Sequence, residues 1–194
     1  MLYALQYMIL YNILMLKIVT TPHPILTSPV KPVTKIDERI KKLVKDMEVT
    51  LTAQRDPEGV GLAAPQVGVS LALFIIKPEK EKPAEVFINP KIIKILPLSR
   101  KYPKKKGKKT QRTKLEGCLS IPKIWSPLVR SDKVLLRYQD LTGKVKEKWF
   151  TGFAAIIIQH EVDHLQGILF TQRSLAANIP LYEEKGESLQ ELKY

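Results

Sequence analysis

The stretch FAAIIIQHEVDHLQGILF, residues 153–170, decides how this chain folds. It places His160 and His164 four residues apart, with Glu161 between them. Residues i and i+4 share one face of a helix, roughly 6 Å apart at Cβ, so both imidazoles can bind one metal ion with Glu161 beside its open position. The flanks are apolar nearly all round, which predicts a buried helix. Histidines and carboxylates buried there need partners or a metal, because burying them unpaired is costly.

The chain's only cysteine, Cys118, lies in a Glu-Gly-Cys-Leu-Ser segment at residues 116–120. A single cysteine excludes an intrachain disulfide and indicates a reducing compartment, so we expect a cytoplasmic protein. Lone buried cysteines are often inert core residues. Here, however, two histidines need a third ligand, and one Cys, two His and a water form a known type of open catalytic site. We therefore predict Cys118, His160 and His164 as the metal ligands.

The 194 residues, 44% of them apolar, are enough for one domain with a substantial core. The net charge of +13 is uneven, because nine of the 32 Lys and Arg lie in a basic insertion at residues 100–114 that contains no acid. Blocks of like charge repel and rarely fold. The insertion is either a solvated loop or a surface that attracts phosphates.

The ends of the chain differ from its middle. Residues 1–16 are uncharged and mostly apolar, too short to span a bilayer and without the features of a secretory signal. We expect an N-terminal extension outside the fold, with a weak membrane or partner contact as the alternative. The catalytic domain is expected at residues 17–170, followed by a polar C-terminal tail at residues 171–194.

The pattern of apolar residues predicts an α+β domain. Helical spacing begins after Asp37, and strands are expected at residues 71–76, 86–88 and 92–96. Two further strands at 134–139 and 145–150 flank a hairpin turn. Because the strands come first and the metal-binding helix late, we expect antiparallel sheets packed around that buried helix. His23, in a proline-rich extended stretch, is predicted to be a surface or packing residue.

A third motif, GVGLAAPQVG, occupies residues 59–68. Its small residues let a backbone approach another group closely. No Lys-Ser/Thr follows it and Pro65 removes an amide, so it is not a phosphate-binding loop. Taken alone, the motif predicts a turn before a strand.

Together, the segments 59–68, 116–120 and 160–164 resemble the three signature motifs of the peptide deformylases, in that family's order. The interval of 42 residues from Cys118 to His160 is typical of the family. The resemblance implies a metal-dependent hydrolase that removes the formyl group from the N-terminal formylmethionine of nascent polypeptides and releases formate. It also implies Fe²⁺ as the native metal ion, with Zn²⁺, Ni²⁺ or Co²⁺ able to replace it.

The resemblance also implies roles for individual residues. Glu161 would move the proton of the attacking water, and the Gln66 amide and the Leu119 backbone N–H would stabilise the developing oxyanion. Gly61 and Gly117 would bind the peptide substrate. Other partners implied are N-formyl-methionyl nascent peptides and, through residues 100–114, the ribosome; we expect no obligate protein partner.

Two acidic residues have expected roles outside the ligand set. In the family, the Asp at the position of Asp163 pairs with an Arg shortly after the cysteine motif, and Arg130 fits that position. Glu116 is either a residue that orients a metal ligand or a solvated loop residue.

Two rival functions use the same residues differently. A zinc endopeptidase of the His-Glu-x-x-His type would take a third His or Glu downstream, but no histidine follows His164 and Glu183 lies in the polar tail. A basic nucleic-acid-binding protein with a structural metal would need a fourth protein ligand, for which His23 is the remaining histidine.

Overall fold

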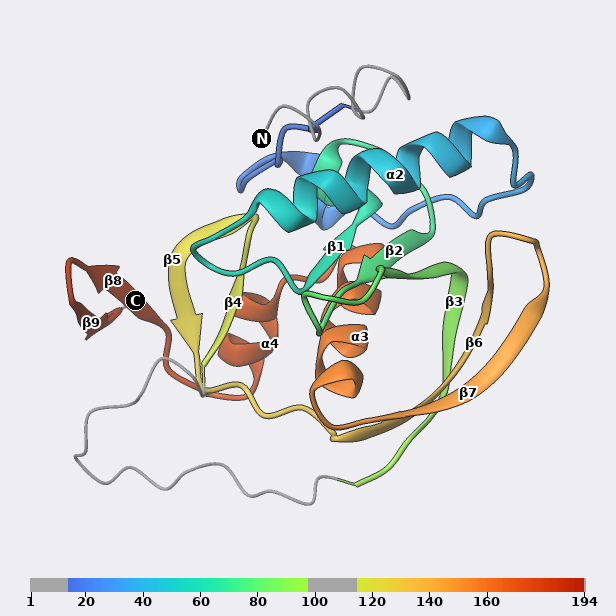
Figure 1. The fold of residues 1–194 in the computed structure, drawn as a ribbon. Helices are drawn as coiled ribbons and strands as arrows, with labels where there is room; N and C mark the ends of the chain where they lie inside the picture. Colours follow the sequence, from blue (N-terminus) through green and yellow to red (C-terminus); the bar gives the residue numbers. More distant parts are fainter. Residues whose placement is uncertain (1–13, 98–114, 194) are drawn as a thin grey trace.

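The computed structural model describes residues 14–97 and 115–193, which form an α+β fold of two antiparallel sheets (Figure 1). The five-stranded sheet has the order β1-β2-β3-β6-β7 and the four-stranded sheet the order β4-β5-β8-β9. The elements in chain order are η1 (Pro24–Thr27), α2 (Glu38–Ala53), β1 (Gly61–Ala63), η2 (Ala64–Val67), β2 (Leu73–Ile76), β3 (Glu85–Ile95), β4 (Glu116–Cys118), β5 (Ile121–Ser126), β6 (Lys133–Gln139), β7 (Val145–Thr151), α3 (Gly152–Leu165), α4 (Phe170–Ala176), β8 (Tyr182–Lys185) and β9 (Ser188–Glu191). The predicted fold class is confirmed.

Helix α3 is the buried helix that the sequence predicts. Ile157, Ile158 and Val162 pack into a core with Phe74 and Phe87 of the five-stranded sheet. The helix after it, α4, contacts β4 and β5 of the second sheet, so α3 and α4 together connect the two sheets (Figure 1). Of the helices in the part of the chain that is described, none is long and apolar enough to cross a membrane.

Helix α2 begins at its predicted start, where the Asp37 side chain accepts hydrogen bonds from backbone amides of the first turn. Asp46 and Thr50 of this helix are buried because the N-terminal backbone crosses them. The Leu14 N–H donates to Asp46 Oδ1 at 2.9 Å and the Leu16 N–H to Thr50 Oγ1 at 2.7 Å. Residues 14–16, which were expected in the extension, therefore contact the fold; the rest of the expected extension, residues 1–13, lies outside the described residues.

The strands predicted at residues 86–88 and 92–96 are one strand, β3, that continues through Asn89 and Pro90. Asn89 adopts a left-handed conformation with φ of 49°, and the register against β6 shifts on either side of Ile92. The Asn89 side chain donates a hydrogen bond to the Val33 carbonyl and accepts one from the Val33 N–H, each at 2.8 Å. Asn and Pro usually form a turn, but in this strand they form an irregularity in the pairing of β3.

Residues 171–194, for which the sequence predicts a polar tail without assigning secondary structure, contain regular elements in their described part, up to residue 193. They complete α4 and form the β8–β9 hairpin, which joins the second sheet through the pair Trp125–Tyr182. Ile179 and Leu181 are buried between these elements. The predicted β6–β7 hairpin, in contrast, is confirmed in full.

Candidate metal centre

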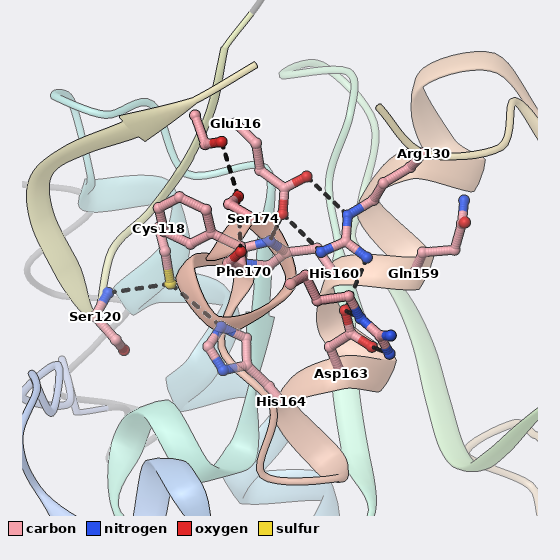
Figure 2. A network of polar contacts seen from close by, with 12 residues as sticks. Glu116, Cys118, Ser120, Arg130, Gln159, His160, Asp163, His164, Phe170 and Ser174 are labelled. Carbon is pink, nitrogen blue, oxygen red and sulfur yellow. Dashed lines mark hydrogen bonds and ion pairs between the residues drawn. The ribbon is translucent and has the colours of Figure 1, made fainter. Parts of the chain in front are cut away.

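The three predicted ligands meet where the two sheets and α3 come together. Cys118 ends β4, and His160 and His164 lie one turn apart on α3 (Figure 2). One ligand atom from each of the three residues lies within 4.8 Å of the others, and Cys118 Sγ is 3.2 Å from His164 Nε2. The two imidazole rings are 4.9 Å apart and nearly perpendicular. This is the arrangement that the i, i+4 spacing predicts.

Local geometry of the β4–β5 hairpin presents the thiol to α3. The pairing shifts between Gly117 and Cys118, so Cys118 lies opposite Ile121 and its Sγ is 3.4 Å from the donating N–H of Ser120. Gly117 pairs with Trp125, and a Cβ on Gly117 would be 2.6 Å from that indole ring. Glycine at this position therefore lets the ring lie against the strand next to the thiol.

His160 is oriented by Glu116, the strand residue two before the thiol. Glu116 Oε1 lies 2.7 Å from His160 Nδ1, which leaves Nε2 as the ring nitrogen for a metal. Arg130 donates two hydrogen bonds to the same carboxylate, both at 2.7 Å. Burial would raise the pKa of Glu116, but the charge of Arg130 and hydrogen bonds from His160 and Arg130 outweigh it and lower the pKa to about 2. Of the two alternatives for Glu116, the orienting residue agrees with this geometry.

Asp163 faces away from the three ligands and links α3 to its neighbours. The predicted ion pair is present, with Arg130 Nη1 donating to Asp163 Oδ2 at 2.8 Å (Figure 2). Arg173 of α4 also donates to both oxygens of Asp163, a contact that sequence reasoning missed. Two arginines and two carboxylates therefore form a continuous chain of ion pairs from α4 through α3 to the orienting residue of His160.

Glu161 lies on the ligand side of α3 and is buried with one oxygen, Oε2, that has no hydrogen-bond partner among the described residues. Burial raises its pKa from 4.5 to about 7. Gly61 of β1 lies so close that a Cβ there would overlap Glu161 Oε1. The close backbone approach that the sequence motif predicts is therefore an approach of β1 to this carboxylate.

Gln66 lies beside the thiol. Its Oε1 accepts from the Ala63 N–H at 2.8 Å, which fixes the side chain, and its Nε2 lies 3.2 Å from Ser120 Oγ and 3.5 Å from Cys118 Sγ. Ser120 is a second residue that we did not single out, although it lies inside the cysteine motif. Leu119 lies between Cys118 and Ser120 and is partly buried against the core that includes α2. This contact holds the segment that carries the Leu119 backbone N–H next to the thiol.

The residues present fit a divalent metal ion. A thiolate and two imidazoles are a common donor set for zinc and other transition metals, and burial lowers the pKa of His164 well below its usual value, which keeps the ring in the neutral, ligating form. His164 Nδ1 has no hydrogen-bond partner in the described part of the chain.

The rival functions lack their ligands. Among residues 14–97 and 115–193, the one group of candidate ligands is Cys118, His160 and His164, with neither Glu183 nor His23 joining it. The His23 side chain instead caps η1 by accepting from the Ile25 N–H at 3.2 Å. Three protein ligands leave an open position, as in catalytic rather than structural zinc sites.

Comparisons with known proteins agree with this geometry. A family model described as polypeptide deformylase matches residues 15–178. The chain is 41% identical over 162 residues to a peptide deformylase of Dictyoglomus turgidum, a match that covers 84% of this chain and 94% of that protein. It also resembles the crystal structure of the Thermotoga maritima peptide deformylase, with a TM-score of 0.67 and 36% identity over 81% of this chain and 96% of that one. The Synechococcus elongatus enzyme in complex with actinonin matches with a TM-score of 0.67 and 35% identity, covering 81% of this chain and 78% of that one.

Proposed function

The chain belongs to the peptide deformylase family, and on that premise we propose that it hydrolyses the N-formyl group of formylmethionine at the start of nascent polypeptides and releases formate. The observation that carries the proposal is the group of Cys118, His160 and His164 with Glu161 beside it, one of whose oxygens has no hydrogen-bond partner among residues 14–97 and 115–193. That arrangement joins three protein ligands and an open position to a proton-transferring side chain, which amide hydrolysis requires.

Cys118, His160 and His164 are proposed to hold one divalent metal ion. When bound, the ion supplies Lewis acidity that activates water and polarises the formyl carbonyl. We propose Fe²⁺ as the native ion, with Zn²⁺, Ni²⁺ or Co²⁺ as substitutes, because the family resemblance implies this set and the donor atoms suit all four. The Glu116 carboxylate fixes the His160 ring so that its second nitrogen faces the site.

Glu161 is proposed to take the proton of the attacking water and to deliver it to the leaving amine. A general acid–base group works best when its pKa lies near the working pH, and burial brings the pKa of Glu161 to about 7. Its Oε2, which accepts no hydrogen bond from the described residues, is available to a water or to the amine.

Gln66 and Leu119 are proposed to stabilise the negative charge that develops on the formyl oxygen. The Gln66 amide is fixed by the Ala63 N–H, so its Nε2 is oriented toward the thiol before substrate arrives. The Leu119 backbone N–H lies in the segment between Cys118 and Ser120. Donors fixed in advance are effective because they need no reorganisation during the reaction.

The peptide is proposed to bind as an added strand along Gly61 and Gly117. β1 is an edge strand of the five-stranded sheet and β4 is an edge strand of the four-stranded sheet. Both edges lie at the metal centre, because Gly61 touches Glu161 and Gly117 precedes Cys118. An extended chain can pair with free strand edges through its backbone, which gives affinity without demanding one sequence.

We further propose that the enzyme works in the cytoplasm, where nascent chains leave the ribosome. The basic segment 100–114 lies outside the described residues; its nine cations would add a salt-dependent attraction to ribosomal RNA. Deleting residues 101–112 should leave hydrolysis of a small formyl peptide nearly unchanged and reduce co-sedimentation with ribosomes at low salt. Equal co-sedimentation of the deletion and the wild type would contradict this role.

The proposed activity is tested by formate release from an N-formyl-methionyl peptide, with the N-acetyl peptide of the same sequence and casein as control substrates. We expect formate release from the formyl peptide only, its loss after chelation, and its return on loading with Fe²⁺ or Ni²⁺. Cleavage of casein without formate release by the metal-loaded protein would instead support the zinc endopeptidase.

A further inference from the structure

Beyond the metal centre, one face of the five-stranded sheet is rich in cations. Val134, Leu136 and Tyr138 of β6 point into the core, so the alternate residues of β6 point to the opposite, outer face. Lys133 and Arg137 lie there, and the β3 residues Lys91 and Lys94 share that face through the pairs Lys91–Arg137 and Lys94–Leu135. We call Lys91, Lys94, Lys133 and Arg137 the basic sheet face.

No described helix covers the basic sheet face. The same side of the sheet is covered by α2 at β2 and at the start of β3, where Val86 and Ile88 pack into the core beneath that helix. Past Asn89 this cover ends, and Lys91, Ile93 and Lys94 are exposed. The transition coincides with the register shifts of β3, which separate a covered from an open part of one strand.

The charge on this face is concentrated and little compensated. The described residues carry 23 of the 32 Lys and Arg and all 19 Asp and Glu, so their formal net charge is +4. On the outer face of β3, β6 and β7 the one described carboxylate is Glu147, which pairs with Arg137 at 2.8 Å. Lys91 and Lys94 make no ion pair with any carboxylate in the described ranges. The four cations and one acid of this face account for +3 of the +4.

Of the described residues on the outer side of β3, β6 and β7, the one aromatic residue is covered by a cation. Trp149 of β7 is 38% exposed, and Lys133 Nζ lies 5.1 Å from the centre of its ring. A ring covered by an ammonium group is poorly placed to stack on a base or to enter a lipid layer. Among the described residues, the face therefore offers positive charges but no uncovered aromatic ring on which a base could stack.

We infer that the basic sheet face binds the phosphate backbone of structured RNA without sequence preference. A polyanion matches cations held side by side on a sheet, and neutralising its phosphates releases counterions, which drives binding and makes it salt-dependent. RNA helices are recognised mainly through shape and backbone contacts rather than base edges. This inference goes beyond formate release and does not depend on it, because the face lies on the side of the sheet opposite α3.

Salt-dependent binding of the full-length protein to a fluorescent RNA duplex tests the inference. The variant K91Q/K94Q is compared with wild type and with K17Q/K31Q, which removes two exposed lysines elsewhere. Each lost phosphate contact lowers the slope of log K against log salt by about 0.7–0.9. We expect K91Q/K94Q to lose about 1.4–1.8 of slope, K17Q/K31Q to keep the wild-type slope, and K91R/K94R to keep it as well. Hydrolysis of a small formyl peptide and the Tm should be unchanged in all variants.

Two outcomes would overturn the inference. The first is a wild-type slope for K91Q/K94Q, which would place any RNA binding elsewhere in the chain. The second comes from vesicles containing phosphatidylserine: if K91Q/K94Q loses vesicle binding while its RNA slope is unchanged, the face serves an anionic membrane instead. The unchanged Tm and peptide hydrolysis exclude misfolding as the cause of a lost slope.

Discussion

The two sides of helix α3 differ in how completely their polar groups are satisfied. On one side, every carboxylate oxygen of Asp163 and of its neighbour Glu116 accepts at least one hydrogen bond. On the other side, Glu161 Oε2 and His164 Nδ1 are buried without a partner in the described part of the chain. A buried polar group left unpaired costs about 1–3 kcal/mol. The satisfied side stabilises the fold, and the unsatisfied side is where chemistry is expected.

The largest effect is expected from Glu161→Gln, on the unsatisfied side. The amide keeps the shape of the side chain but cannot take up the proton of water, so kcat should fall by about 10²–10⁴-fold. Metal content should stay at one ion per chain, because Glu161 is not a ligand. Metal analysis together with formate release measures both, and near-normal turnover by the metal-loaded variant would remove Glu161 from the mechanism.

Glu116→Gln is the matched substitution on the satisfied side. It weakens the hydrogen bond that orients His160, and loss of such a partner typically costs 10–100-fold in metal affinity or activity. We expect weaker metal binding, with kcat at saturating metal much closer to wild type than in Glu161→Gln. If the two variants showed the same pattern, the distinction between the two sides of α3 would fail.

Asp163→Asn should have the next largest effect, on stability rather than on chemistry. Arg130 is buried between Glu116 and Asp163, and breaking a buried pair by removing one partner costs about 3–5 kcal/mol. The free energy of unfolding, measured with urea, should fall toward that range. A value equal to wild type would mean that Arg130 and Arg173 find other partners.

The pH dependence of stability distinguishes the two glutamates. In the metal-free protein Glu161 has a pKa of about 7, above its ordinary 4.5, so the folded state keeps a proton that the unfolded chain loses. The free energy of unfolding must therefore fall as pH rises from about 4.5 to about 7. A pKa shift of this size corresponds to a change of about 3 kcal/mol in the free energy of unfolding across the interval.

Urea unfolding of chelated wild type and Glu161→Gln between pH 4.5 and 8 isolates this contribution. The stability of the wild type relative to the variant should decrease across the interval. Glu116 does not interfere in this pH range. Its pKa is lowered from 4.5 to about 2, so its contribution to the free energy of unfolding is present above pH 4.5 and is lost only as the pH falls toward 2. A constant difference between the two proteins would show that Glu161 is ionised in the folded state throughout.

The sequence predicted the centre of the site better than its surroundings. The i, i+4 histidines and the single cysteine carry their own constraints, since helix geometry and the need for a third ligand leave few alternatives. The pairing of Arg130 with Asp163 was predicted from the family resemblance rather than from a local pattern. Arg173 could not be predicted, because its contact with Asp163 depends on where α4 packs, and no local pattern encodes that.

The same reason explains the errors in the fold. β8 reads Tyr-Glu-Glu-Lys, which has no alternation of apolar and polar residues, and it becomes a strand through long-range pairing with β5. Asn89 and Pro90 carry strong turn signals, yet the side chain of Asn89 is bonded to Val33, 56 residues away in sequence. Tertiary contacts decided both segments, whereas α2 and α3 followed from local periodicity.

The smallest effect is expected from Arg173→Gln, which tests how redundant the satisfied side is. The Arg173 side chain is 45% exposed, and exposed ion pairs contribute about 0.2–1 kcal/mol. Arg130 remains on Asp163 Oδ2 in this variant, so the carboxylate is not left unpaired. We expect a loss of unfolding free energy below about 1 kcal/mol, with metal affinity and kcat unchanged. A loss as large as that of Asp163→Asn would show that Arg173, rather than Arg130, carries the ion-pair chain, and that α4 is the element that holds α3 in place.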